Sequence, residues 1–237
     1  MESTGVYWKP VWNVWEGQFE ILLGNAQHIK AVPGRKTDQK DSEWIADLLQ
    51  HGLLKGSFVP PAPVRELRDL TRYRVRLAQE CNRIANRVQN VLEDANIQLA
   101  SVATDALGAS GRAMLDAMIE GETDSGELAE MSKGLLRNKK AELRLALEGR
   151  VTEHHRFLLK QLMRHLRFTE ARMNDVEQEI ERRMEPYHDD VKRLCSIPGV
   201  ERVTAWGLFA ERALAPCSSA RFTRVFIIVV VVRLVVR

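Results

Sequence analysis

Two stretches in the middle of the sequence repeat apolar residues with the alternating three- and four-residue spacing of a coiled-coil helix. The first consists of Leu67, Leu70, Leu77, Cys81, Ile84, Val88 and Val91, with Arg74 at one seam position. The second consists of Leu159, Leu162, Leu166, Met173, Val176 and Ile180. Such spacing puts an apolar stripe along a long helix, which is stable only when it packs against another helix. We therefore predict a mainly α-helical fold built on two long antiparallel coiled-coil helices.

Residues 1–60 alternate between helical and extended patterns. Aromatic residues in the stretch Tyr7–Glu16 predict a short helix, and Phe19–Leu23 predicts a short buried strand. Thr37 can cap a helix that runs to about Leu54. This alternation is typical of an α/β layer, and we expect only a fragment of one, since a single strand has no partner in the segment.

Proline and glycine residues divide the rest of the chain. The stiff linker Val59–Pro63 separates the first segment from the helical region. Gly111, Gly121 and Gly134 are expected to break residues 108–149 into shorter helices, which would form a small cap on the long pair.

A second turn signal lies at Leu194–Val200, where one helix ends at Pro-Gly and another begins near Thr204. This is the outline of a helix-hairpin-helix, whose tight turn offers backbone N–H groups to a phosphate. Glu201 stands where a second glycine is usual and brings an acid close to that turn. A purely structural turn and a DNA contact are both open interpretations.

The patterns predict four segments. Residues 1–60 form a partial α/β domain, 61–190 a helical coiled-coil region, 191–211 the start of a C-terminal domain, and 212–237 an aberrant apolar tail. The Val-rich run at Phe226–Arg237 is shorter than the roughly 18 residues of a membrane-spanning helix, so no membrane partner is expected. If exposed, it would promote aggregation. We interpret it as foreign to the rest of the chain, with a buried strand as the alternative.

Charge and cysteine content indicate in which compartment the protein works and how a basic surface could arise. The chain has 35 Lys and Arg against 32 Asp and Glu, a net charge of +3, so a basic surface must come from clustering. Three widely spaced cysteines form neither a disulfide framework nor a zinc motif, and they suit a reducing compartment. The N-terminus has no secretory signal pattern. These features predict a cytoplasmic protein.

A basic cluster does occur along the first long helix. Its members are Arg65, Arg68, Arg72, Arg74, Arg76, Arg83 and Arg87, and only Glu66, Asp69 and Glu80 offset them. The cluster has two interpretations. It can be the solvated flank of a coiled coil, or a track along which arginines contact backbone phosphates of a nucleic acid.

Two acids, Asp38 and Asp41, lie three residues apart in the first turns of a predicted helix, so their carboxylates can point the same way. Close carboxylates repel each other unless a cation neutralises them. Oxygen ligands of this kind suit Mg²⁺ or Mn²⁺. Acids in the first turn also stabilise a helix through its dipole, without a metal. Their spacing alone leaves both interpretations open.

Two motifs resemble those of a known enzyme family. Met1-Glu-Ser-Thr-Gly-Val-Tyr-Trp8 is similar to the motif E-[AS]-T-G-x-Y-[WH], and Lys36-Thr-Asp-Gln-Lys-Asp41 is similar to K-T-D-x-x-D. Their order and separation, the helical middle and the later Ile-Pro-Gly-Val element all resemble DEDD-type transposases of bacterial insertion sequences, the insertion sequence one-ten family. This family also includes Piv-type DNA invertases. The resemblance covers residues 1–211.

The resemblance implies a RuvC-like (RNase H-like) domain that cleaves and rejoins DNA strands with Mg²⁺ or Mn²⁺. It implies that Glu2 is the second acid of a metal-binding tetrad, and that Asp38 and Asp41 are the third and fourth. Lys36 is similar to a family basic residue that could neutralise a phosphate.

The implied partners are DNA, a structured guide RNA and further copies of the chain in a homo-oligomer. The resemblance therefore favours the nucleic-acid interpretation of the basic helix. The expected contacts are Arg65, Arg68, Arg72, Arg76 and Arg83.

The sequence departs from the family pattern at both ends. The first tetrad acid would lie on a strand before Glu2, and the serine that the family is thought to use as nucleophile has no counterpart, since Ser218 and Ser219 lie in diverged sequence. We therefore expect a truncated, inactive copy of a transposase. The alternatives are a nonenzymatic coiled-coil nucleic-acid-binding protein and a purely structural coiled coil.

Overall fold

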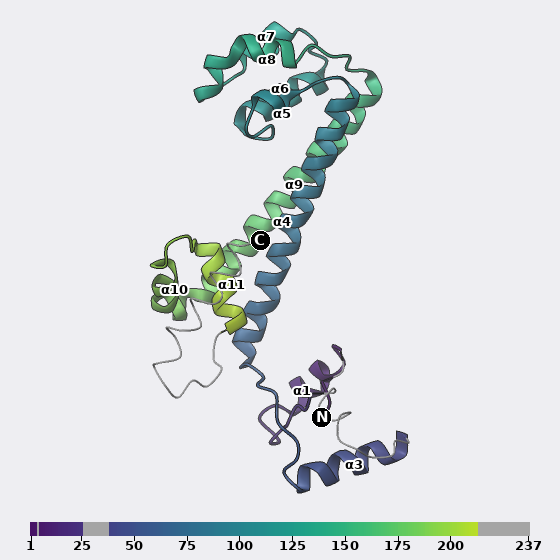
Figure 1. Ribbon diagram of the computed structural model, residues 1–237, viewed down its shortest axis with the longest axis vertical. Coiled ribbons are helices and arrows are strands. Elements are labelled where there is room, and N and C mark those ends of the chain that lie inside the picture. The colour runs from purple at the N-terminus through teal and green to yellow at the C-terminus, as the bar shows by residue number, and fades with distance from the viewer. Residues whose placement is uncertain (4, 26–37, 213–237) are drawn as a thin grey trace. The chain divides into compact units, whose positions relative to one another are not determined.

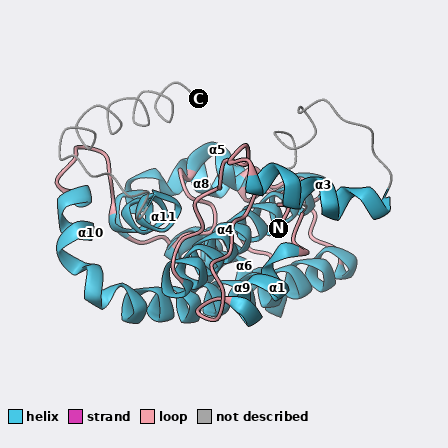
Figure 2. Cartoon of the chain, turned by 90° about the horizontal axis from the view of Figure 1, so that it is seen from below, coloured by secondary structure: helices cyan, strands magenta, loops and turns pink. Residues whose placement is uncertain are grey.

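The computed structural model describes residues 1–3, 5–25 and 38–212 (Figure 1). The described residues divide into two compact units, the first within 1–65 together with Arg212 and the second 66–211. Throughout those described ranges the regular elements are helices, and the only β-pairing consists of isolated bridges (Figure 2). The prediction of a mainly α-helical chain is confirmed.

In the first unit, two of the expected helices are present. Helix α1 (Trp8–Trp15) is the short aromatic helix, and Pro10 lies in its first turn, where a missing N–H does no harm. Helix α3 (Asp38–Gln50) is the helix expected after Thr37, and it buries Leu48. Thr37 itself lies outside the described residues.

The strand expected at Phe19–Leu23 is wrong. Phe19 is 65% exposed and makes one isolated bridge with Glu16, and Gly24 makes single bridges with Glu2 and with Gly56. The expectation of an unpaired segment is wrong as well, since Gly24 has backbone neighbours on both sides. A ladder of one bridge on each side is too short to count as a strand, because strands gain stability from several consecutive pairs.

Two long helices dominate the second unit. Helix α4 (Ala62–Asp94) and helix α9 (Glu153–Met184) run antiparallel and side by side (Figure 1). An ion pair joins Glu66 to Arg183 near one end, and a hydrogen bond joins His155 to Asp94 at the other. Both long helices were expected from the heptad spacing, while knobs-into-holes packing between them stays a prediction.

The buried stripe of the pair follows the predicted pattern with local shifts of one residue. Thr71 is buried where Leu70 was expected, and Leu92 where Val91 was expected. A straight α-helix has 3.6 residues per turn and drifts against a 3.5-residue repeat, so the buried position shifts to a neighbouring residue along the helix. The shared core consists of Ile84, Val88, Leu92, Leu159, Met163 and Leu166.

A helical cap continues this core beyond the long pair. It consists of α5 (Leu99–Val102), α6 (Ala109–Glu120), α7 (Ser125–Glu130), the 3₁₀ helix η1 (Gly134–Lys139) and α8 (Lys140–Ala146). Gly121 ends α6 with a left-handed φ of 118°, as a helix-terminating glycine should. Gly111, by contrast, lies inside α6, and its expected role as a breaker is wrong. A Cβ there would collide with the carbonyl oxygen of Ala106, so the close approach of the backbone explains the glycine.

After α9, the 3₁₀ helix η2 (Glu185–Tyr187) leads into α10 (His188–Cys195), and α11 (Arg202–Arg212) follows. Two helices joined by a turn at Pro-Gly are therefore present, while the helix-hairpin-helix itself stays a prediction. Gly199 has a φ of 82°, and Val200 N donates to Ile197 O at 3.0 Å. That N–H is used inside the turn, and a DNA contact here stays a prediction. The expected apolar tail lies outside the described residues from position 213 onward. No helix of the described part is long and apolar enough to cross a bilayer.

Candidate acidic site and basic helix face

Glu2 lies on extended backbone that is held in the first unit. Its bridge to Gly24 is made by Ser3 N donating to Gly24 O at 2.9 Å and by Gly24 N donating to Met1 O at 2.8 Å. The terminal ammonium of Met1 also donates to Leu22 O at 2.9 Å. Glu2 is half-buried. These backbone bonds keep the second expected tetrad acid in a defined place.

Asp38 and Asp41 occupy the start of α3, at positions i and i+3. The expected first-turn placement on a helix is therefore present in the backbone. The side chains of residues 38–42 and the whole of Lys36 lie outside the described residues. Within the part of the chain that is described, no three His, Cys, Asp or Glu side chains cluster as metal ligands.

A groove of about 550 Å³ lies nearby in the first unit. Its lining is Met1, Trp15, Phe19, Glu20, Ile21, Leu22, Ile45, Leu49 and Leu54. With one carboxylate among apolar side chains, this groove has too few oxygen ligands for a divalent cation. The groove is therefore not a candidate for the metal site that the acidic motifs predict.

Arg65, an expected phosphate contact, is engaged in the first unit. It donates to both carboxylate oxygens of Glu16, at 2.9 and 2.6 Å, and to Pro60 O at 2.8 Å. The bidentate hydrogen bond from Arg65 lowers the pKa of Glu16 to about 2. Arg65 thus links the start of α4 to the end of α1.

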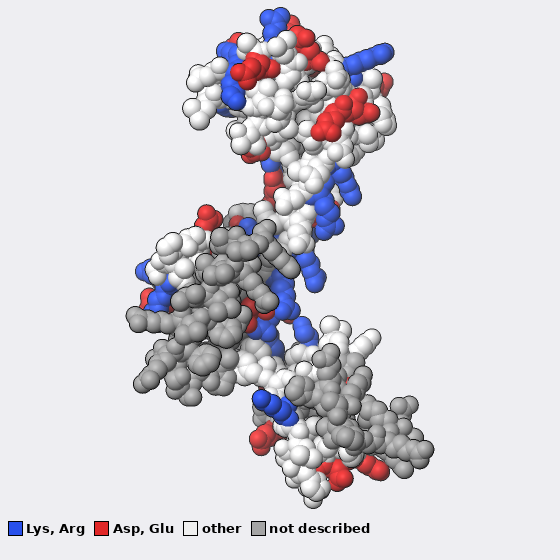
Figure 3. Space-filling view, viewed as in Figure 1, with Lys and Arg blue, Asp and Glu red and all other residues white. Residues whose placement is uncertain are grey.

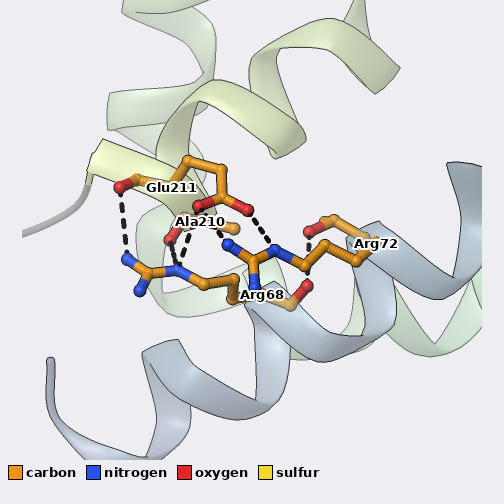
Figure 4. A network of polar contacts seen from close by, with 5 residues as sticks. Arg68, Arg72, Ala210 and Glu211 are labelled. Carbon is orange, nitrogen blue, oxygen red and sulfur yellow. Dashed lines mark hydrogen bonds and ion pairs between the residues drawn. The ribbon is translucent and has the colours of Figure 1, made fainter. Parts of the chain in front are cut away.

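Arg68 and Arg72 fasten α4 to the end of α11 (Figure 4). Arg68 donates from Nε to Ala210 O at 3.0 Å and from Nη2 to Glu211 O at 3.1 Å. Arg72 donates from Nε and Nη2 to the two carboxylate oxygens of Glu211, at 2.6 and 3.0 Å. The hydrogen bond to Glu211 raises the pKa of Arg72. Two arginines that the sequence suggested for phosphates therefore have an internal carboxylate and carbonyl as partners.

Arg76 and Arg83 present their charge to solvent. Arg83 is 62% exposed at the side chain, and its ion pair with Glu80 at 3.2 Å is of the weak i,i+3 kind. Arg76 is also exposed, and with Arg87 the three follow an i, i+7, i+11 spacing that lines one helix face. Figure 3 shows Lys and Arg side chains gathered along the long helices, with few acidic side chains among them. This face can approach a polyanion.

Sequence reasoning did not find Glu16 or Glu211 as partners of the arginines. Glu211 lies 139 residues from Arg72, and Glu16 lies 49 residues from Arg65. No local spacing links residues this far apart, so only the folded chain reveals the pairs.

Comparison with known proteins bears on the acidic motifs. Residues 1–97 match the family model of the DEDD transposase domain of the IS110 (insertion sequence one-ten) family, which is described as a transposase. No curated protein and no solved structure matches the chain. The matched residues include Glu2, Asp38 and Asp41. The resemblance seen in the motifs is thereby confirmed over residues 1–97, which are similar to the transposase domain of the IS110 family.

Proposed function

We propose that this transposase acts on insertion-sequence DNA by metal-dependent strand cleavage and rejoining. The family match over residues 1–97 carries the proposal, because it spans both acidic motifs in their expected order. A mobility assay with the ends of the element and its guide RNA would test it.

The residues that would hold Mg²⁺ or Mn²⁺ are Glu2, Asp38 and Asp41. The donor chemistry fits, since hard divalent cations prefer carboxylate oxygens. Support comes from the backbone, because Glu2 is anchored by its bridge to Gly24 and both aspartates lie on one helix. When bound, such ions activate a water or hydroxyl and stabilise the leaving oxygen of a phosphodiester. Lys36 would neutralise a phosphate of the DNA.

The test is a titration of Mn²⁺ into the full chain, followed by electron paramagnetic resonance. We expect weak binding that the Asp38→Asn, Asp41→Asn variant loses and that Glu2→Gln weakens. Asp47→Asn is the matched control, because Asp47 lies on the same helix and outside both motifs. Equal binding by the double variant and the unchanged chain would overturn the metal assignment.

A second candidate is a nonenzymatic nucleic-acid-binding protein, and the exposed stripe Arg76, Arg83 and Arg87 favours it. On the transposase proposal, the same stripe holds DNA or a structured guide RNA, and the protein acts as a homo-oligomer. The two candidates differ in metal dependence. Binding of nucleic acid with no binding of Mn²⁺ at the acidic motifs would favour the second.

A further inference from the structure

The outward face of α9 carries two phenylalanines that the core does not use. Phe157 and Phe168 are 60% and 59% exposed, and Arg164 lies between them on the same helix. The spacing i, i+7, i+11 puts all three on one line. That line lies opposite the buried stripe through Leu159 and Leu166. Two exposed phenylalanines therefore lie on one line of the helix, with a cation between them.

The same stretch of helix is entirely free of acids. Between Glu153 and Glu170 the sequence contains Arg156, Lys160, Arg164 and Arg167 and no Asp or Glu. Arg167 pairs with Asp116 of α6 at 2.5 Å, while Lys160 and Arg164 are exposed beside the phenylalanines. The face therefore combines flat apolar rings with positive charge.

Phe168 is also held in place from one side. The guanidinium of Arg172 lies 5.6 Å from the centroid of the Phe168 ring. Arg172 in turn donates from Nη2 to the hydroxyl oxygen of Tyr73 on α4 at 3.0 Å. This chain of contacts limits the rotamers of the ring, so a flat ligand that stacks on Phe168 meets a preorganised surface.

We propose that this face of α9 binds single-stranded nucleic acid, with unpaired bases stacking on Phe157 and Phe168 and phosphates contacting Lys160 and Arg164. Aromatic rings interleaved with cations are the combination that single strands recognise, because every base has a stacking face and every nucleotide a negative charge. The two rings are roughly 16 Å apart along the helix, a span that a few extended nucleotides cover. The surface goes beyond the proposed function, since it uses neither the acidic motifs nor the arginines of α4.

A second copy of the chain fits this face less well. An antiparallel or parallel copy would set Lys160 and Arg164 against the same cations, and α9 offers no acid between Glu153 and Glu170 to offset them. Like charges held together in an interface are destabilising, whereas a polyanion gains from each of them. Charge complementarity thus selects the nucleic acid.

The experiment measures fluorescence anisotropy of labelled oligothymidylate and oligouridylate, each of about 20 nucleotides, with the full chain. We expect Phe157→Ala and Phe168→Ala each to raise the Kd about tenfold. Phe168→Leu should lose as much affinity as Phe168→Ala, because leucine is apolar but cannot stack on a base. Phe168→Trp should keep the affinity, and its tryptophan fluorescence should be quenched on binding. Leu135→Ala is the control, since Leu135 is 87% exposed in the cap.

The outcomes separate the alternatives. Preference for one oligonucleotide identifies DNA or RNA as the source, and either preference supports the proposal. Unchanged affinity of the Phe157→Ala, Phe168→Ala variant overturns it, as does tighter binding of duplex than of single strand. A second copy would be favoured, and the proposal overturned, by two results together. Phe168→Leu would bind the oligonucleotides as tightly as the unchanged chain, and the Phe157→Ala, Phe168→Ala variant would lose self-association in sedimentation. Failure here leaves the Mn²⁺ titration unaffected, because this face holds no expected metal ligand.

Discussion

The imidazole Nε2 of His155 lies 2.8 Å from Oδ2 of Asp94, and this contact joins the last residue of α4 to the first turn of α9. The other ring nitrogen, Nδ1, accepts a hydrogen bond from the backbone N–H of Thr152 at 3.2 Å. The Thr152 hydroxyl oxygen accepts in return from the His155 N–H at 3.4 Å. Since Nδ1 accepts, Nε2 carries the proton and donates to Asp94. One side chain thus serves both as the cap of a helix and as the link between two helices.

Loss of this side chain should destabilise the second unit. We expect His155→Ala to lower the free energy of unfolding by about 1–2 kcal/mol, because it removes a capping box and a partly buried hydrogen bond together. Chemical denaturation followed by circular dichroism measures the change. His154→Ala, one residue away and exposed, should have little effect. Equal destabilisation by the two variants would contradict the assigned role of His155.

Neutralising Glu211 should loosen α11 and strengthen nucleic-acid binding. Glu211→Gln removes the charge that holds Arg72, so amide hydrogen exchange in α11 should become faster. The released Arg72 can then contact a phosphate, so duplex DNA should bind more tightly at low salt. Glu201→Gln, at the start of the same helix, is the control. If amide hydrogen exchange in α11 and the affinity for duplex DNA both stay unchanged, the ion pair neither stabilises α11 nor keeps Arg72 from DNA.

The Arg65–Glu16 ion pair should make the first unit sensitive to acid. The folded pKa of Glu16 is about 2, against an ordinary value of 4.5. A depressed carboxyl pKa stabilises the fold fully above the unfolded value, and this contribution fades as the pH falls from about 4.5 toward 2. The stability difference between the unchanged chain and Arg65→Gln should therefore shrink over that range.

Tryptophan fluorescence suits this measurement, since Trp8, Trp12, Trp15 and Trp44 all lie in the first unit. Arg76→Gln serves as the control, because it should produce no such pH-dependent difference. The pairing would be contradicted if the free energies of unfolding of the unchanged chain and of Arg65→Gln differed by a constant amount from pH 5 down to the pH at which the chain unfolds.

The exposed arginines of α4 should determine how salt affects duplex binding. Each phosphate contact contributes about 0.9 to the slope of log K against log salt concentration. We expect Arg76→Gln and Arg83→Gln each to reduce the slope by about that amount. Arg182→Gln is matched in exposure but lies beside Glu179 near the end of α9, and it should leave the slope alone. If the Arg76 and Arg83 variants keep the full slope, their side chains belong to a solvated flank.

Gly111 and Gly207 form a contrasting pair of helical glycines. Gly111→Ala should destabilise by about 1–3 kcal/mol, because its Cβ would meet backbone atoms of Ala106. Gly207→Ala, with no heavy atom within 4 Å of its added Cβ, should be neutral or stabilising by up to about 1 kcal/mol. Thermal unfolding of both variants checks the pair, and a stabilised Gly111→Ala would refute the close contact.

Periodic and motif-based features of this protein were predictable from the sequence alone. The heptad spacing from Leu67 to Val91 predicts a long helix, because burial of one stripe repeats with the helix itself. The acidic motifs around Glu2 and Asp38–Asp41 indicate the family whose model matches residues 1–97, because residue types at set distances along the chain define such motifs. In both cases the information is local, so reading along the chain recovers it.

The tertiary structure alone decided which surfaces meet. Arg68 and Arg72 look like phosphate ligands in the sequence, and only the docking of α11 gives them Ala210 and Glu211 as partners. Phe19–Leu23 has the composition of a strand, yet Phe19 and Gly24 find backbone partners only in isolated bridges that never extend into a ladder. Gly111 resembles a helix breaker until the approach of Ala106 explains it. Long-range contacts depend on the packing of whole elements, and no local pattern of residues encodes that packing.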